Sequence, residues 1–246
     1  MNRKNVIEVN NISKSYGDTL VIDDISFNVK EGEFLSIVGT SGCGKTTLLN
    51  ILSDLDKNYF GKIAYYIDRN KTEYMLQESA LFPWLNVLNN ASLGCIIKHI
   101  DDTKYVSNLL DKYGLKEYKE EYPSKLSGGM KQRVSLIRSI STKPEVLFLD
   151  EPFGALDFQT RLIISNDIYK FAKENKITVI LITHDISEAA SLSDRVIVLS
   201  KKPSKIKKII NIDFSDEIGP IKRRESEKFT EYYKLIQKEL DLFNES

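Results

Sequence analysis

Continuously apolar runs recur along the chain, and each gives way abruptly to glycine or polar residues. Residues 34–38, 146–149 and 179–182 contain a single Ser among otherwise apolar side chains. A run without alternation is typical of a strand that is buried on both faces. A similar run over residues 195–200 adds a fourth strand, and together they predict an α/β core.

The N-terminal part of the chain has a different pattern, in which apolar and polar residues alternate. Apolar side chains at positions 6, 7 and 9 and at positions 25, 27 and 29 flank a turn at residues 16–18. This spacing predicts two antiparallel strands, and residues 63–67 add another strand-like segment. We therefore predict an N-terminal antiparallel β-subdomain beside the core.

Residues 86–122 are helix-rich, and Gly114 and Pro123 act as helix-ending signals. We interpret this region as an inserted α-helical subdomain. Further amphipathic helices are predicted after residue 157 and over residues 229–240. The predicted division assigns 1–80 and 142–246 to the core with its β-subdomain and 81–141 to the helical subdomain.

A phosphate-binding pattern, G-x-x-x-x-G-K-T, follows the first apolar run. It reads Gly39-Thr40-Ser41-Gly42-Cys43-Gly44-Lys45-Thr46. Its glycines let the backbone bend around a polyphosphate, so that N–H groups and the N-terminus of the next helix face negative charge. Lys45 is expected to reach the β- and γ-phosphates, and the Thr46 hydroxyl to ligate Mg²⁺. A glycine-rich turn before an ordinary helix is the alternative, but the strand, Lys and Thr favour a nucleoside triphosphate site.

A second anion-binding helix N-terminus is predicted at Ser127, an N-cap residue followed by Gly128 and Gly129. These glycines let backbone N–H groups approach a ligand closely. One small domain has little use for two such sites on one phosphate tail. The arrangement therefore points to a nucleotide shared between subunits.

Two of the apolar runs are followed by polar side chains that can bind a metal ion or activate water. Asp150 is placed to hold Mg²⁺ through water, and Glu151 to polarise an attacking water. His184 can bond the γ-phosphate or position that water. The alternatives are a pair of solvated loop acids and a structural His. Tyr16 precedes the phosphate-binding loop, where it stacks on adenine or is a half-buried strand aromatic.

Composition narrows the function classes. The chain has 246 residues with 35 Lys and Arg and 35 Asp and Glu, so its formal net charge is zero. This balance does not support nucleic acid as a partner, and the local basic clusters at 201–202, 205–208 and 222–224 are interpreted as solvated faces. Two cysteines give no disulfide framework. With no signal peptide and no run of about 18 apolar residues, a cytoplasmic protein is expected.

Cys43 lies inside the phosphate-binding loop, at a helix N-terminus and beside Lys45. Such a position makes a thiol reactive. If the loop is open, Cys43 is expected to react with a maleimide faster than Cys95, and bound MgATP should slow that reaction. The alternative is a buried, inert packing residue.

The phosphate-binding loop, residues 126–133 and the run ending in Asp150 and Glu151 together resemble an ATP-binding cassette (ABC) transporter ATPase. Eight features in the same order cover nearly all of the chain. Besides the loop they are Tyr16 (adenine-stacking aromatic), Gln77 (glutamine loop), Ser127-Gly128-Gly129 (signature), Asp150 (metal-side acid), Glu151 (general base), Asp157 (dimer-interface aspartate) and His184 (switch histidine).

The resemblance implies an α/β P-loop NTPase (RecA-like) core and a role for each motif. Nucleotide contacts are implied for Tyr16, Gly39 to Thr46, Thr47, Ser127, Gly128, Gly129 and Asp157. Mg²⁺ is implied at Thr46, Gln77 and Asp150, and catalysis by Lys45, Gln77, Glu151 and His184. Two subunits, identical or paralogous, would sandwich two ATP molecules, each loop facing the signature of the other subunit.

Hydrolysis in the resembling family drives a membrane-spanning permease, which a solute-binding protein supplies, so a place on the inner face of the cell membrane is implied. A narrower resemblance is to the importer ATPases for nitrate, sulfonates, taurine, bicarbonate and pyrimidine vitamin precursors. It rests on residues 81–87, on the signature ending in Met130-Lys131-Gln132-Arg133 and on residues 194–199. Met130 replaces the commoner Gln, and the stretch from Lys45 to Gln77 is shorter than usual. Both departures leave the chemistry intact but weaken any substrate assignment.

Three other functions are alternatives to import. A soluble ABC ATPase acting on DNA or ribosomes usually has two fused cassettes or long coiled-coil insertions, which this sequence lacks. A non-catalytic nucleotide sensor does not need Glu151 and His184. An exporter ATPase is disfavoured by the Phe82-Pro83-Trp84 stretch and by the lack of a fused membrane domain. We therefore expect an ATP-hydrolysing importer subunit.

Overall fold

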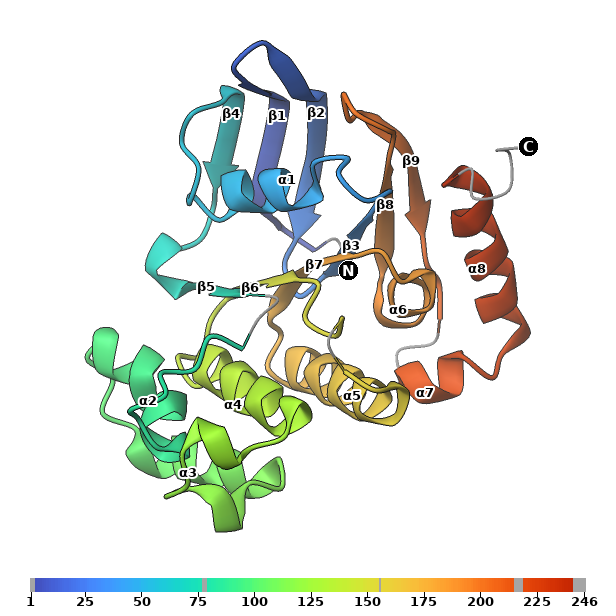
Figure 1. Ribbon diagram of the computed structural model, residues 1–246. Helices are drawn as coiled ribbons and strands as arrows, with labels where there is room; N and C mark the ends of the chain where they lie inside the picture. The colour runs from blue at the N-terminus through green and yellow to red at the C-terminus, as the bar shows by residue number, and fades with distance from the viewer. Residues whose placement is uncertain (1–2, 77–78, 155, 215–218, 241–246) are drawn as a thin grey trace.

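The computed structural model describes residues 3–76, 79–154, 156–214 and 219–240, which form two sheets flanked by helices (Figure 1). The central sheet has six strands in the order β5-β6-β7-β3-β8-β9. They are β3 (Phe34–Val38), β5 (Thr72–Met75), β6 (Val146–Asp150), β7 (Thr178–Thr183), β8 (Arg195–Leu199) and β9 (Ile206–Asn211). The four apolar runs of the sequence form β3, β6, β7 and β8, and the predicted α/β class is confirmed.

Burial explains why these strands read as apolar runs. All residues of β3, β6 and β7 are buried, and the three strands pair in parallel. The edge strand β9 differs, because it runs antiparallel to β8 and exposes Lys207 and Lys208. Charges on an edge strand oppose pairing with another chain. These lysines are solvated as expected, but they lie on a strand that the sequence pattern did not indicate.

The second sheet is antiparallel and has three strands in the order β2-β1-β4. They are β1 (Asn5–Tyr16), β2 (Thr19–Lys30) and β4 (Phe60–Tyr65). Tyr16 pairs with Thr19 across the turn, where Gly17 has a φ of 56°, a left-handed conformation that glycine adopts at little cost. The predicted N-terminal antiparallel sheet is confirmed, with its third strand beginning at Phe60 rather than at Ile63.

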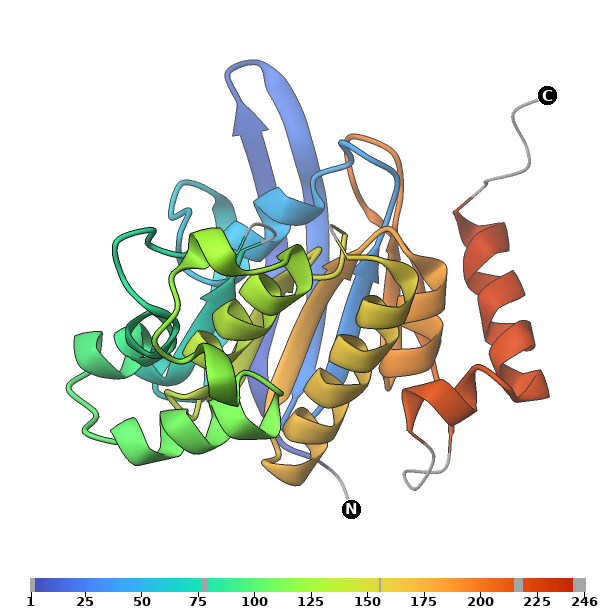
Figure 2. The ribbon, with the colours of Figure 1, turned by 60° about the horizontal axis from the view of Figure 1, so that its bottom comes forward.

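The two faces of the central sheet carry different layers. Figure 2 shows α4 (Gly128–Ile140) and α5 (Phe158–Glu174) side by side along one face, where they pack with Leu149 and Leu181. On the other face Phe148 and Ile180 pack with α1 (Lys45–Leu52) and with β1 and β2. Because side chains alternate across a strand, each apolar run supplies both cores.

Helices α2 (Val87–Ile97) and α3 (Thr103–Lys112) pack with α4 at one end of the molecule (Figure 1). Each of the three begins at a side-chain N-cap: Asn86, Asp102 and Ser127. Short 3-10 turns at Arg69–Lys71, Lys116–Tyr118 and Pro123–Lys125 complete the connections. Within the described residues, no helix combines the length and apolarity needed to cross a membrane.

The C-terminal layer consists of α6 (Ile186–Leu192), α7 (Pro220–Arg223) and α8 (Glu227–Glu239). The predicted apolar face of α8 packs onto the domain through Ile236 and Leu240. The expectation that residues 222–224 form a solvated face is wrong for Arg223, which is 1% exposed. Its guanidinium donates to Ser191 O at 3.1 Å and to Tyr169 Oη at 2.6 Å, so the docking of α7 buries this charge among hydrogen-bond acceptors.

Candidate active site

The carboxyl ends of three parallel strands meet at one edge of the central sheet. The pairing register places Val38 beside Thr183 and Asp150 beside Ile182. The phosphate-binding loop therefore lies close to Asp150, Glu151 and His184, although these residues are far apart in the sequence. Such carboxyl edges are where open α/β sheets bind their ligands.

The phosphate-binding loop, residues 39–46, depends on glycine at two positions. Gly42 and Gly44 have φ values of 75° and 110°, and a Cβ on Gly44 would also lie only 2.9 Å from Val21 Cγ1. The next residue, Lys45, opens α1, and its ammonium donates to Gly39 O at 3.0 Å and to Thr40 O at 3.2 Å. The Lys45 charge is thus held within the curve of the loop, where phosphate oxygens can replace these carbonyl acceptors.

Cys43 is buried beneath this loop. Only 1% of its surface is exposed, against 3% for Cys95, and a Cβ on Gly39 would lie 2.6 Å from Cys43 Sγ. The structure agrees with the alternative interpretation of Cys43 as a buried packing residue, because its side chain fills the space below the loop. Cys43 supports the loop through its backbone, since its N–H donates to Thr40 O at 3.2 Å.

A cavity of about 470 Å³ opens in front of the loop. It is lined by Tyr16, Val21, Ser41, Gly42, Gly44, Lys45, Thr46, Thr47, Glu151 and Lys202. Tyr16 is 53% exposed, so it is not the half-buried aromatic of the alternative interpretation. Lys14 Nζ lies 4.8 Å from the centre of its ring, and the Tyr16 hydroxyl donates to Asp56 Oδ2 at 3.4 Å. These contacts fix the ring at the cavity wall.

Glu151 and His184 contact each other directly. Glu151 Oε2 lies 2.9 Å from His184 Nδ1, and because an ionised carboxylate only accepts hydrogen bonds, Nδ1 carries the proton in that state. Glu151 has a φ of 45°, which is uncommon for a residue with a Cβ and typical of functional turns. Its N–H donates to Ile182 O at 2.9 Å, so β7 holds the backbone of Glu151 in this conformation.

Asp150 is the buried acid of the site. Asp150 Oδ1 accepts from the Thr46 hydroxyl at 3.2 Å, and Oδ2 accepts from the Tyr74 hydroxyl at 3.1 Å. Burial raises the pKa of Asp150. Burial also raises the pKa of Tyr74, so this hydroxyl keeps its proton and acts as a donor. Tyr74 on β5 is a site residue that the sequence analysis did not identify.

The oxygens of Thr46 and Asp150 are of the type that Mg²⁺ prefers. In the described part of the chain, no group of three or more His, Cys, Asp or Glu side chains could hold a metal ion by itself. The donor set therefore fits a Mg²⁺ that also takes oxygens from phosphates and water, as Mg²⁺ commonly does in nucleotide sites. Gln77, the third predicted ligand, lies outside the described residues.

The second predicted anion site lies at the N-terminus of α4. Ser127 caps this helix, since its Oγ accepts from the Met130 N–H at 3.3 Å. A Cβ on Gly128 would meet nothing within 4 Å, whereas one on Gly129 would lie 2.7 Å from Thr160 Cγ2. Gly128 thus leaves the backbone open to a ligand, while Gly129 is required by the close packing of α4 on α5.

Gly128 belongs to a different cavity from that of the phosphate-binding loop. This cavity measures about 780 Å³ and is lined by Ser79, Ala80, Leu81, Pro83, Pro123, Ser124, Gly128, Lys131, Gln132 and Leu156. It is the larger of the two, but it contains none of the phosphate-binding residues. Within one chain the two predicted anion sites therefore do not share a cavity.

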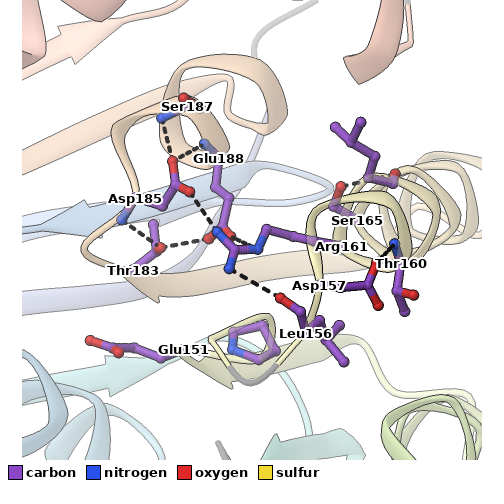
Figure 3. A network of polar contacts seen from close by, with 12 residues as sticks. Glu151, Leu156, Asp157, Thr160, Arg161, Ser165, Thr183, Asp185, Ser187 and Glu188 are labelled. Carbon is purple, nitrogen blue, oxygen red and sulfur yellow. Dashed lines mark hydrogen bonds and ion pairs between the residues drawn. The ribbon is translucent and has the colours of Figure 1, made fainter. Parts of the chain in front are cut away.

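The loop before α5 and the loop that carries His184 are joined through Arg161 (Figure 3). Arg161 donates to Leu156 O at 3.3 Å and to Asp185 Oδ2 at 3.0 Å. Asp185 follows His184 and caps α6. Asp157, the predicted dimer-interface aspartate, is exposed and caps α5 immediately beside this network.

Glu188 lies behind Arg161, as Figure 3 also shows. It is a buried residue of α6 whose Oε2 accepts from the Thr183 hydroxyl at 2.6 Å. Arg161 Nε lies 3.9 Å from its other carboxylate oxygen. Burial dominates over these contacts and raises the pKa of Glu188 to about 7.

Comparison with known proteins identifies the family. Residues 22–154 match the model of the ABC transporter family. The chain is 38% identical over 244 residues to an uncharacterized ABC transporter ATP-binding protein of Methanocaldococcus jannaschii, a match that covers 94% of this chain and 89% of that protein. The chain belongs to the ABC transporter family.

Two other similar proteins add detail to this ABC assignment. The aliphatic sulfonates import ATP-binding protein SsuB of Bacillus cereus is 36% identical over 246 residues, which cover 96% of each chain. A dimeric structure of a post-hydrolysis ATP-binding cassette bound to ADP and Pi has a TM-score of 0.74 and 29% identity, and the match covers 85% of this chain and 100% of that one. The predicted cassette fold and the resemblance to the ABC ATPases are confirmed.

Helix α4 also holds the turn after β6 and the segment at residues 79–80, through two residues that the sequence analysis did not single out for this role. Gln132 Nε2 donates to Pro152 O at 2.6 Å, next to Glu151. Arg138 donates to Ser79 O at 3.0 Å and to Ala80 O at 2.9 Å. Gln132 is buried although Lys131 and Arg133 flank it in the sequence, so no local pattern indicated its contact with Pro152.

Proposed function

We propose that this protein is the ATP-hydrolysing subunit of an ABC importer and powers uptake of a small solute through a separate permease. The observation that carries the proposal is the contact between Glu151 and His184, because Glu151 lines the same cavity as Lys45 and Thr46. A nucleotide sensor needs no such pair. The sulfonate-import relatives favour import over a soluble ABC ATPase that acts on DNA or ribosomes.

The residues that line the cavity account for nucleotide binding. Tyr16 stacks on adenine, and the N–H groups of residues 39–47 and the ammonium of Lys45 hold the phosphates. Thr46, Asp150 and Gln77 are the residues proposed to hold Mg²⁺, which when bound supplies positive charge to the phosphate oxygens. Catalysis of phosphoryl transfer consists mostly of such positioning and electrostatics.

Water activation is assigned to Glu151. Its carboxylate accepts a proton from the attacking water as general base, and His184 orients that carboxylate through Nδ1. Burial of Asp150 and the hydroxyl of Tyr74 keep the metal-side acid in place. The left-handed backbone of Glu151 directs its side chain toward the cavity instead of along the strand.

A dimer completes the site in this proposal. Ser127, Gly128 and Asp157 are exposed, and they lie outside the cavity of the phosphate-binding loop. A second subunit, identical or paralogous, would bring its own signature to that cavity, with Ser127, Gly128 and Gly129 contacting the γ-phosphate. The dimeric state of a similar cassette supports this arrangement.

The permease is proposed to contact the surface that follows the glutamine loop. Trp84 is 68% exposed, and its ring lies 5.1 Å from that of Phe82, beside the 780 Å³ cavity. The core at 1–80 and 142–246 would hydrolyse ATP, and the helical subdomain at 81–141 would transmit the change. The solute is of the nitrate, sulfonate, taurine or vitamin-precursor kind, delivered by a solute-binding protein, with the ATPase at the inner face of the cell membrane.

Replacing Glu151 tests hydrolysis. Glu151→Gln is expected to bind MgATP but to lower the turnover rate by about 10²–10⁴-fold, the contribution of a positioned general base, and to form an ATP-dependent dimer on size exclusion. Glu145→Gln, near the opposite end of β6 and on the surface, is the matched control and should retain the wild-type rate. Near-normal turnover by Glu151→Gln would refute the assignment of Glu151 as the general base.

Replacing Trp84 tests coupling. Trp84→Ala should leave hydrolysis by the isolated subunit unchanged and reduce transport in the assembled complex. Phe60→Ala removes an exposed aromatic ring from the N-terminal sheet and serves as the control, with both activities retained. An equal loss of hydrolysis and transport in Trp84→Ala would show that the segment around Trp84 has only a structural role and does not contact the permease.

A further inference from the structure

Lys202 is a charged residue of the nucleotide cavity that no sequence motif indicates. It lies in the loop between β8 and β9, residues 200–205, and lines the cavity together with Tyr16, Val21 and the phosphate-binding loop. Its side chain is exposed. None of the described hydrogen bonds or ion pairs involves it, in contrast to Lys205 of the same loop, whose Nζ lies 3.0 Å from Asp23 Oδ2.

The position of Lys202 is fixed by the residue two places further on. Ser204 is completely buried, and its hydroxyl donates to Cys43 O in the phosphate-binding loop. The Ser204 N–H donates to Val21 O at 2.8 Å, and Ser204 O accepts from the Asp23 N–H at 2.9 Å. The β8–β9 loop is thereby tied both to the phosphate-binding loop and to β2, so Lys202 is held beside the cavity.

The strand order shows which part of a nucleotide Lys202 faces. In the sheet, β3 lies between β7 and β8. The loop after β3 therefore has Glu151 and His184, from β6 and β7, on one side and the β8–β9 loop on the other. Glu151 and His184 mark the γ-phosphate end. Tyr16 and Val21 come from β1 and β2, to which the β8–β9 loop is tied, so Lys202 stands on the nucleoside side.

The Lys202 ammonium, which has no carboxylate partner among the described contacts, lines the same cavity as Lys45 and the phosphate-binding loop, and two such cations together attract a polyanion. We propose that Lys202 is a further phosphate-binding residue, which contacts the α- or β-phosphate of the nucleotide from the β8–β9 loop. The proposal rests on nucleotide binding at the phosphate-binding loop. It assigns a function to one residue of a basic cluster that composition alone describes as a solvated face.

Affinities of the full-length chain for fluorescent ADP and ATP analogues test this role. Lys202→Ala should weaken both nucleotides by the same factor, roughly 3- to 10-fold, the range for an exposed charge bonded to an anion, and Lys202→Glu should weaken both further. The loss should shrink at high salt because the contact is exposed. Lys201→Ala, which removes the neighbouring charge outside the cavity, is the matched control and should bind as the wild type does.

Three outcomes overturn the inference. They are unchanged affinity in Lys202→Ala, an equal loss in Lys201→Ala, and a loss confined to ATP, which would place the contact at the γ-phosphate. Thermal unfolding of each variant excludes misfolding as a cause of weaker binding. Failure of the proposed function looks different, because the wild-type chain would then bind neither nucleotide and Lys45→Ala would change nothing.

Discussion

Arg161 donates through Nη1 to Asp185 Oδ2 at 3.0 Å, and the same guanidinium donates to Leu156 O at 3.3 Å. One side chain thus connects the loop that precedes α5 to the residue that follows His184. Asp157 of the first loop is proposed to meet a second subunit, and His184 contacts Glu151. We therefore propose that formation of a dimer at Asp157 acts on Glu151 and His184 through this side chain.

Arg161→Ala is expected to lower the turnover rate on the order of 10- to 100-fold while leaving the KM for ATP nearly unchanged. Misplacement of a catalytic group by about 1 Å can cost 10²-fold, whereas the nucleotide contacts lie elsewhere. Lys170→Ala, an exposed position on the same helix, is the control. Steady-state hydrolysis measures both parameters, and a rise in KM without a fall in turnover rate would contradict this positioning role.

Tyr74→Phe is expected to raise the Mg²⁺ concentration for half-maximal hydrolysis by on the order of 10-fold. The lost hydroxyl donates to Asp150 Oδ2, and removing a partner of a metal-site carboxylate typically weakens metal affinity by 10- to 100-fold. A Mg²⁺ titration of hydrolysis measures the effect. Tyr66→Phe removes an exposed hydroxyl that donates to Glu8 and should leave the titration unchanged. Coincident titration curves for Tyr74→Phe and the wild type would show that Tyr74 does not contribute to Mg²⁺ binding.

Gly129→Ala and Gly128→Ala should differ in stability although they are neighbours on α4. The added methyl at Gly129 meets Thr160 Cγ2 at 2.7 Å, but the one at Gly128 meets nothing. Overpacking of this kind costs about 1–3 kcal/mol of unfolding free energy. Gly129→Ala should therefore unfold at lower denaturant concentration, and adding Thr160→Ser should restore stability by removing Cγ2. A double variant as unstable as Gly129→Ala would refute the steric explanation.

Glu188→Gln should change how stability depends on pH. Burial raises the pKa of Glu188 from 4.5 to about 7 in the folded chain. Between these values the folded state binds more protons than the unfolded state, so this residue makes stability fall as pH rises. Arg161, Asp185 and Arg224 also face the carboxyl group, and their effects are included in its pKa.

The amide of Glu188→Gln does not titrate, so its stability relative to the wild type should rise by up to about 3 kcal/mol from pH 4.5 to pH 8, at about 1.4 kcal/mol per pH unit of difference between the folded and unfolded pKa. Denaturant unfolding at several pH values measures this difference. Glu231→Gln, an exposed position on α8, is the control and should track the wild type. Parallel curves for Glu188→Gln and the wild type would show that Glu188 titrates normally.

The sequence predicted the central sheet because its strands are buried on both faces and must therefore be apolar throughout. Strand β9 was not predicted, because it is not buried on both faces. It is an edge strand in which exposed Lys207 and Lys208 interrupt the isoleucines, so it contains no continuous apolar run. Burial of Arg223 depends on where α7 docks, which no local pattern encodes.

The candidate site was predictable where a residue directly follows a buried strand, as Glu151 and His184 do. Tyr74, Gln132 and Arg161 act across elements, with partners at Asp150, Pro152 and Asp185, so only the folded structure reveals them. Cys43 shows a further limit. The loop motif fixes the path of the backbone, but the direction of each side chain depends on the space beneath it.

Helices α2, α3 and α4 have no hydrophobic core of their own in the described structure. Their buried residues, such as Val106 and Ile137, belong to the same cluster as Leu149 and Leu181 of the central sheet. During synthesis the chain emerges from its N-terminus, so α4 leaves the ribosome before β7 exists. Leu181 of β7, which belongs to the same core as the apolar face of α4, is therefore made only after α4 and α5 have emerged.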